Sequence, residues 1–467
     1  NKMGKGGDGK NVAVKHAKQE PHAIDAKYQQ YLLPNLDAAT FREDLLKAKE
    51  AVGEATAEDA AHMLRLVTVV NLLSVVGPLV LFVTVSFRYI YGGESLLLAA
   101  LGCTVSGLCI STARCMAWTI VGHHTMHGGF SDLAKSGEMT PRWRRGTFAI
   151  GAWRRIVDWL DWMLPEAWNL EHNKLHHYQL SEEGDPDVVE ANFQTLREMP
   201  LPVFVKMAVM GFFMLTWKYT YYSTNTLKQL LMSEKDTWMV RNWPQAEPKA
   251  APLVAMRFPV AILSSVLRGN LKDALFWLVF SLRWLLLISP MLLSVFAPPA
   301  LLLASDLAGL WPASAPGSAA DAARLALAVC VLAECLTNAH SFIIIACNHA
   351  GDDLWRFSSP CKPYGAEFFL RCAYAGVNFE TGTEIVDVLY GWLNYQIEHH
   401  MFPDMTPLQY RKLQPLVKEV CRKHKVLYIQ ENAVWRTWKT CMVATGGASM
   451  GRCEAVLPPT SEDPKTK

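Results

Sequence analysis

Four long apolar segments dominate the hydrophobic pattern of the chain. They run over about residues 66–87, 96–121, 273–297 and 323–347. Each reaches the roughly 20 residues that a helix needs to cross the hydrocarbon core of a bilayer. The charged residues of particular interest inside them are Arg114, Arg283 and Glu334. A charge is costly in hydrocarbon, so we expect these side chains to face protein, a cavity or the interface. The pattern predicts four transmembrane helices.

Shorter segments accompany these four. The run 201–217 is apolar but contains Lys206, which predicts a buried or interfacial helix rather than a further span. Amphipathic patterns predict helices over 38–64 and over 406–424. Residues 1–30, and those after Thr445, have the composition of loose segments. We therefore predict a polar N-terminal segment over 1–64, a membrane domain over 65–430 and a C-terminal tail over 431–467.

The distribution of basic residues predicts an orientation in the membrane. The link 298–322 has no Lys or Arg, whereas 122–272 carries many basic residues. The positive-inside rule places that middle region and both termini on one side, cytosolic or stromal. Basic residues are otherwise scattered and the net charge is only +2, which gives no indication of nucleic-acid binding. The eleven cysteines form no C-x-x-C pair, and we expect reduced thiols.

Eight of the fourteen histidines fall into three tight clusters beside the apolar segments. The clusters read His123-His124-Thr125-Met126-His127, His172-Asn173-Lys174-Leu175-His176-His177 and Gln396-Ile397-Glu398-His399-His400. All three lie on the same predicted side of the membrane. On an α-helix, residues four apart share one face, which pairs His123 with His127 and His172 with His176. Neutral imidazole suits iron, copper or zinc, and three clusters indicate two metal ions.

Further residues are candidates for the same site. His340 and His349 follow the fourth apolar segment, and His349 is the better candidate for an additional ligand. The acidic residues Glu182, Glu183, Asp185 and Asp187 follow the second cluster, and Glu398 lies within the third. Metal-bound histidine commonly donates its other ring N–H to a carboxylate, which is one role for these acids. A solvated acidic loop is the alternative.

The three clusters resemble the histidine boxes of the membrane fatty acid desaturase family, H-x(3,4)-H, H-x(2,3)-H-H and [HQ]-x-x-H-H. Gln396, the following Met-Phe-Pro, the Asp185-Pro186-Asp187 turn and the stretch Tyr410 to Pro415 are similar to the front-end, acyl-lipid subgroup. Members of that subgroup usually carry a fused cytochrome b5 domain, whereas no His-Pro-Gly-Gly haem motif occurs here. His124 stands where the first box often has Asp, which leaves open whether His123 or His124 binds metal.

This resemblance implies an all-α integral membrane protein whose four transmembrane helices carry a cytosolic or stromal helical cap with a di-iron site. It implies an enzyme that uses O2 and two electrons to desaturate the acyl chain of a lipid or of acyl-CoA, in an endoplasmic reticulum or chloroplast membrane. The implied iron ligands are the seven box histidines His123, His127, His172, His176, His177, His399 and His400, with Gln396 and His349 as further candidates.

Electrons must then come from outside the chain, because no haem, flavin or iron–sulfur motif occurs in it. We expect a small acidic donor, cytochrome b5 or a ferredoxin. Its candidate docking patch consists of Arg142, Arg144, Arg145, Arg154 and Arg155, although positive-inside bias explains these arginines equally well. The aromatic stretch Trp153, Trp159, Trp162 and Trp168 lines a path for the acyl chain or forms an ordinary interfacial belt.

Other functions fit the same boxes. A hydroxylase, an acetylenase, a sphingolipid desaturase or a carotenoid oxidase would use the same iron chemistry with another product. A non-enzymatic membrane subunit would retain the boxes as a structural metal site and would bind metal without consuming O2.

Overall fold

The computed structural model of the chain describes residues 31–233, 241–242 and 254–458. Within these ranges, four helices are long and apolar enough to cross a membrane, in agreement with the sequence prediction. They are α2 (Ala57–Tyr89), α3 (Leu96–Met116), α14 (Leu271–Leu307) and α15 (Ala319–Ile345). The segment 1–30, expected to be loose, lies outside the described residues.

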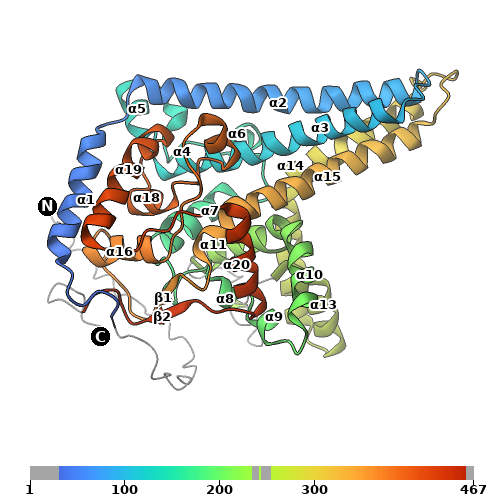
Figure 1. Cartoon of the computed structure of the whole chain (residues 1–467). Coiled ribbons are helices and arrows are strands. Elements are labelled where there is room, and N and C mark those ends of the chain that lie inside the picture. The colour runs from blue at the N-terminus through green and yellow to red at the C-terminus, as the bar shows by residue number, and fades with distance from the viewer. Residues whose placement is uncertain (1–30, 234–240, 243–253, 459–467) are drawn as a thin grey trace, which may run out of the picture.

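The four long helices extend together from one end of the molecule (Figure 1). The α2–α3 turn and the α14–α15 loop meet at the tip, where Gly317 donates a backbone hydrogen bond to the carbonyl of Tyr89 at 3.0 Å. Leu72, Leu286 and Leu301 are exposed by 60%, 73% and 69%. Such apolar surface along a helix is typical of one that faces lipid. Helix α14 continues to Leu307 through Pro298 and Pro299, so the predicted link is shorter than expected.

The charges inside the spans are paired within the protein. Arg114 of α3 forms an ion pair with Glu334 of α15, and it also donates to the Ser294 hydroxyl of α14 at 3.1 Å. Trp162 donates from its indole nitrogen to the other oxygen of Glu334 at 2.7 Å. Both charges therefore face protein, as the cost of an unpaired charge in hydrocarbon predicts. Arg283 is half-buried.

Short helices build a body at the opposite end of the molecule. Those that precede α14 are η1 (Ala117–Gly122), α4 (His123–His127), α5 (Ser131–Ser136), η2 (Pro141–Trp143), α6 (Ala152–Asp158), α7 (Pro165–Leu170), η3 (Glu171–His176), α8 (Val189–Asn192), α9 (Gln194–Glu198), α10 (Val203–Met214), η4 (Lys218–Tyr222), α11 (Ser223–Ser233) and α13 (Val254–Leu267). Those that follow α15 are η5 (Ala346–His349), α16 (Ala366–Tyr374), α17 (Glu384–Leu389), α18 (Gln396–Met401), α19 (Pro407–His424) and α20 (Ala433–Thr445). The largest hydrophobic core lies here and surrounds the three histidine clusters.

The N-terminal amphipathic segment is two helices rather than the one that was expected. Helix α1 (Ala38–Val52) ends at Gly53, whose φ of 76° favours glycine, and α2 starts four residues later behind Thr56. Helix α1 packs against α19. The predicted helix over 406–424 is confirmed as α19, which begins at a capping box formed by Thr406 and Gln409.

The C-terminal segment is more ordered than its composition suggested. Helix α20 packs against α10 and η5, and beyond it β2 (Gly451–Cys453) pairs in parallel with β1 (Trp355–Phe357). Glu190 of α8 accepts from the backbone nitrogen of Met450 at 3.1 Å and fixes this segment to the body. The expectation of a loose chain after Thr445 is therefore wrong as far as residue 458. The proposed domain boundaries remain a prediction.

Candidate metal centre

The three histidine clusters converge in the interior of the body. Helix α4 carries His123 and His127, η3 carries His172 and His176, and α18 carries His399 and His400. His177 directly follows η3, and all seven imidazoles are buried. Together with His349, they form two neighbouring groups, each small enough to surround one ion, and His172 and His176 also form a smaller group with Asp187. The boxes are therefore brought together from segments that lie far apart in the chain.

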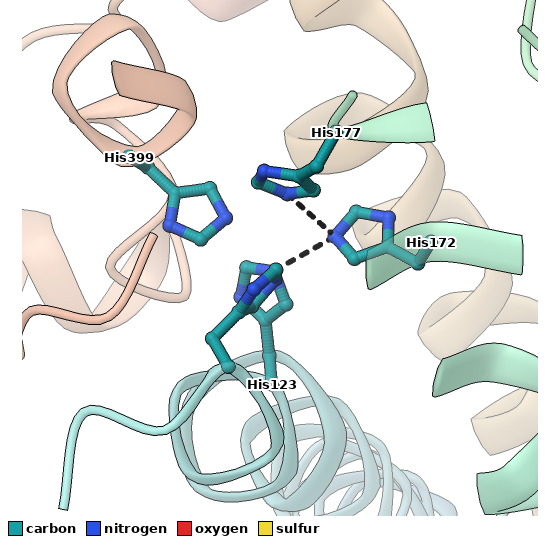
Figure 2. A group of neighbouring side chains, drawn as sticks. His123, His172, His177 and His399 are labelled. Carbon is teal, nitrogen blue, oxygen red and sulfur yellow. Dashed lines mark hydrogen bonds between the residues drawn. The ribbon is translucent and has the colours of Figure 1, made fainter. Parts of the chain in front are cut away.

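The first group contains five histidines whose ligand atoms lie within 4.8 Å of one another, namely His123, His127, His172, His177 and His399. Figure 2 shows four of these rings pointing toward a common centre. The Nε2 atom of His123 lies 3.1 Å from that of His127 and 3.1 Å from that of His172. The Nε2 atom of His172 lies 3.3 Å from that of His177.

These separations fit ligands of a common metal ion. Imidazole nitrogens bind such ions at about 2.0–2.1 Å, so neighbouring ligands lie roughly 3.0–3.4 Å apart in octahedral to tetrahedral geometry. Hydrogen bonds account for them less well. Each ring nitrogen offers one proton or one lone pair, so at most two of the three contacts along this chain of Nε2 atoms can be hydrogen bonds. The Nε2 atom of His399 has no hydrogen-bond partner in the described structure.

The second group contains His176, His349 and His400, with the side-chain amide of Gln396 between them. The Gln396 Nε2 atom lies 2.8 Å from His349 Nε2 and 3.0 Å from His400 Nε2, and its Oε1 atom has no partner within the described residues. Rotation of the amide by 180° exchanges its nitrogen and oxygen, so the oxygen can equally occupy the position between the imidazoles. An oxygen there would be a metal ligand.

Hydrogen bonds at Nδ1 orient two rings of the second group and leave Nε2 as the candidate ligand atom of each. The Nδ1 atom of His349 lies 2.9 Å from the carbonyl oxygen of Ala375, which makes Nδ1 the donor. The Nδ1 atom of His176 lies 2.9 Å from Asp185, one of the predicted acids. Asp185 is itself held by the backbone nitrogens of Ser181 and Asp187 at 2.8 and 2.9 Å. This arrangement orients the ligand and increases its basicity.

The other predicted acids have different roles. Asp187 lies 3.9 Å from His176 Nδ1, too far for a hydrogen bond. Glu182 forms an ion pair with Arg371 at 2.7 Å, and Glu183 is exposed. Glu398 accepts from Asn378 at 2.7 Å and from Tyr428 at 2.8 Å. Burial raises the pKa of Glu398 to about 7, against the opposing effect of these two hydrogen bonds.

The electrostatics favour neutral imidazoles at most of the site. Burial, with repulsion from neighbouring imidazolium charge, places the pKa values of His172, His177, His399 and His400 well below the usual range. Burial also lowers the pKa of His176, but the charge and hydrogen bond of Asp185 outweigh it, and the net shift is upward. Deprotonated nitrogen is the form that binds metal.

The second box departs from the α-helical spacing assumed for it. The π-helical segment η3 makes hydrogen bonds over five residues, and His177 donates its backbone N–H to the carbonyl of His172 at 3.1 Å. His172 and His177 therefore share the first group, and His176 reaches the second. π-Helical turns are frequent at functional sites, and another, η1, directly precedes His123.

Two of the candidate histidines, His124 and His340, lie outside both groups. His124 is buried, but neither of its ring nitrogens has a hydrogen-bond partner in the described structure, and the first group contains His123 instead. His340 lies 2.6 Å from the carbonyl oxygen of Leu389 through Nε2. The geometry thus favours His123 over His124 and His349 over His340.

An apolar pocket of about 700 Å³, its mouth included, adjoins the second group. His172, His176, His349 and Gln396 form one wall, and apolar residues of α10, α15 and α20 form much of the rest. Representative lining residues are Met210, Phe213, Phe342, Ile345 and Ala444. A second pocket of about 310 Å³ shares His172 and Gln396 and reaches His123. Both pockets lead to the nitrogens that face the candidate metals.

Of the four tryptophans expected to line an acyl path, one lines a pocket. Trp168 lines the smaller pocket and stacks on the ring of His172, with centroids 4.6 Å apart. Trp159 and Trp162 are buried in the body, so they do not form an interfacial belt, and Trp153 is 74% exposed. No sequence pattern indicated the pocket wall from α10 and α20, because apolar residues in such helices are typical of ordinary core positions.

Comparison with known proteins identifies the family. Residues 95–432, which include all three boxes, match the family model described as "Fatty acid desaturase". The chain belongs to this family. No solved structure matches it.

Curated relatives match shorter stretches of the chain. It is 31% identical over 91 residues to Delta(8)-fatty-acid desaturase 1 of Arabidopsis thaliana, covering 19% of this chain and 20% of that one. It is 51% identical over 43 residues to Fatty acid desaturase 3 of Bos taurus, covering 9% and 10%. It is 29% identical over 123 residues to the NADPH-dependent stearoyl-CoA 9-desaturase of Mycobacterium tuberculosis, covering 24% and 28%. The matched part thus spans less than a third of each of these relatives.

Proposed function

We propose that the protein is an O2-dependent di-iron enzyme that introduces a double bond into the acyl chain of a lipid or of acyl-CoA. The observation that carries this proposal is the pair of buried imidazole groups beside an apolar pocket. Five histidines would hold one iron, and His176, His349, His400 and Gln396 would hold the other. Two bound irons would supply the activation of O2 and the abstraction of hydrogen from an unactivated methylene.

The chain's own residues would position the substrate. The apolar residues of α10, α15 and α20 would pack against an acyl chain, and the imidazole wall would place its methylenes beside the metals. Burial of all seven box histidines excludes bulk water from the reacting region. The balanced reaction consumes O2, two electrons and two protons, converts CH2–CH2 to CH=CH and releases two molecules of water.

We further propose that the boxes face the cytosol or stroma of an endoplasmic reticulum or chloroplast membrane. The α2–α3 turn and the α14–α15 loop lie at the tip away from the body, in keeping with the basic residues of the middle region (Figure 1). A cysteine label placed at Ser314 should report the side opposite to a label placed at Lys135 of α5. Labels that report the same side would contradict this orientation.

The test of activity is expression in a desaturase-deficient host, followed by fatty acid profiling. A new double bond at one position supports the proposal. Hydroxylated or acetylenic products would instead indicate a different outcome of the same iron chemistry. Stoichiometric metal without O2 consumption would indicate a structural subunit.

A further inference from the structure

One surface of the body carries a residue that is bonded directly to a member of the first histidine group. Tyr178 directly follows His177, and its hydroxyl lies 3.2 Å from the hydroxyl of Tyr364. Tyr364 is 42% exposed, whereas His177 is buried. We propose that a small acidic electron-transfer protein docks on the surface around Tyr178 and Tyr364. This proposal rests on the proposed function, which requires electrons from outside the chain.

Basic residues lie on the segments that carry the two tyrosines and on α1 beside them. Arg42 of α1 donates from Nε to the carbonyl oxygen of Tyr364 at 2.9 Å. Lys174 is exposed one turn before Tyr178, and Lys362 is exposed two residues before Tyr364. An acidic partner would be steered toward such a surface, and charge-steered encounters suit electron transfer.

Arg145 is exposed and acts on Tyr364 through its charge. Burial and the hydrogen bond with Tyr178 raise the pKa of Tyr364, and the charge of Arg145 acts in the opposite direction. Asp404 also acts on Tyr364, and Lys49 lies 3.3 Å from that carboxylate. Arg42 and Arg145 thus act on Tyr364 beside an acid that is already paired.

The position in the molecule suits a soluble partner. Arg42 lies on α1 and Tyr364 lies just before α16, and both helices are at the end of the molecule away from the α2–α3 turn (Figure 1). A partner can reach this end without contacting the hydrocarbon core.

The other arginines of the patch expected from sequence are engaged elsewhere. Arg142 and Arg154 form ion pairs with buried Asp158 at 2.6 and 3.6 Å. Arg144 donates to the carbonyl oxygen of Ala134 at 3.3 Å, and Arg155 donates to that of Leu287 in α14. Next to them, Trp153 and Val157 of α6 are exposed by 74% and 55%. Exposed apolar side chains mixed with basic ones are typical of a membrane interface. Of the five arginines, Arg145 is thus the one that the structure connects with the tyrosine pair.

The electron count limits what the partner must do. Each double bond requires two electrons, so two molecules of a one-electron donor are oxidised in succession, and the two protons come from solvent. The tyrosines are not themselves oxidised in this scheme. Their role is to bring the donor's redox centre close to His177, so that the electron crosses a short and partly covalent path.

The test compares charge reversals on two surfaces of the full chain. Arg145→Glu with Lys362→Glu reverses two charges on the proposed surface, and Arg268→Glu reverses one charge at the end of α13, remote from α1 (Figure 1). The probe is the soluble haem domain of an acidic cytochrome b5, with a plant-type ferredoxin in a parallel series. We expect the double variant to raise the Kd about ten-fold at low ionic strength, with the difference fading at high salt. Arg268→Glu should leave the Kd unchanged.

Binding is measured separately from turnover, so that two failures can be told apart. The docking surface would be overturned if the double variant bound both probes at low ionic strength with the Kd of the wild type. It would also be overturned if Arg268→Glu raised the Kd equally, or if the wild type bound neither probe. The double variant should retain a single turnover when it is reduced anaerobically with dithionite, freed of the excess and then exposed to O2, because this route bypasses docking. If the wild type binds donor but forms no product in this single turnover, the docking surface stands and the proposed function fails.

Discussion

The two histidine groups differ in how they are built. The first consists of five box histidines, and the distances between its Nε2 atoms are those of ligands on one ion. The second combines two box histidines with an amide and with His349, which lies at the end of the fourth long helix. The first group therefore depends on its imidazoles themselves, whereas the second has fewer imidazoles and depends also on the hydrogen bonds that orient them. We expect the second group to be the more sensitive to its surroundings.

The largest effect should follow the loss of a ligand from the first group. His127→Ala removes the imidazole that faces both His123 and His177, and we expect product to fall below detection while the chain still inserts in the membrane. Fatty acid profiling and a protease-protection assay measure the two outcomes. The control is His340→Asn, which lies outside both groups and should retain activity. Product at the wild-type level from His127→Ala would remove the first box from the mechanism.

Removal of His349, the additional ligand candidate, tests the second group. His349→Ala should lower activity about 100-fold and reduce bound iron from two ions to one, because few ligands remain there. Metal analysis of the purified variant measures the iron. If the variant keeps two irons, His349 is a hydrogen-bonded interface residue and the second group is wrongly composed.

The acid behind the second group should matter less than the ligands. Asp185→Asn keeps the shape but removes the charge that holds His176 Nδ1–H, and we expect iron affinity to fall about 10-fold. Titration with a competing chelator measures this affinity. Glu183→Gln, an exposed neighbour, is the matched control. An equal change in both variants would indicate a general effect of the acidic loop rather than orientation of His176.

The smallest effect should come from an exchange within the second group. Gln396→His supplies an imidazole where an amide now stands 2.8 Å from His349 and 3.0 Å from His400. Because the third box of the family allows either residue, we expect activity to persist and iron to be held more tightly. Loss of iron would show that the amide serves as a spacer between the two imidazoles and is not itself a ligand.

The hydrophobic and histidine patterns of the sequence predicted the spans and much of the candidate site. The length of the apolar segments located the four spans. The histidine clusters located the first group but did not show which histidines of the second box lie together in it. That pairing depends on the π-helical turn of η3, in which His172 lies beside His177 instead of His176, and no residue type specifies such a turn. The role of His349 depends on where the fourth helix ends relative to α18. The pocket wall and the Tyr178–Tyr364 contact join segments distant in sequence, which a reading of single segments cannot place.

The central claim is that two unlike groups each hold one iron. The most direct measurement is an anomalous difference map at the iron absorption edge, from crystals of the iron-loaded protein. The account predicts two peaks, one among His123, His127, His172, His177 and His399 and the other among His176, His349 and His400. A single peak, or a second peak away from His349, would contradict it.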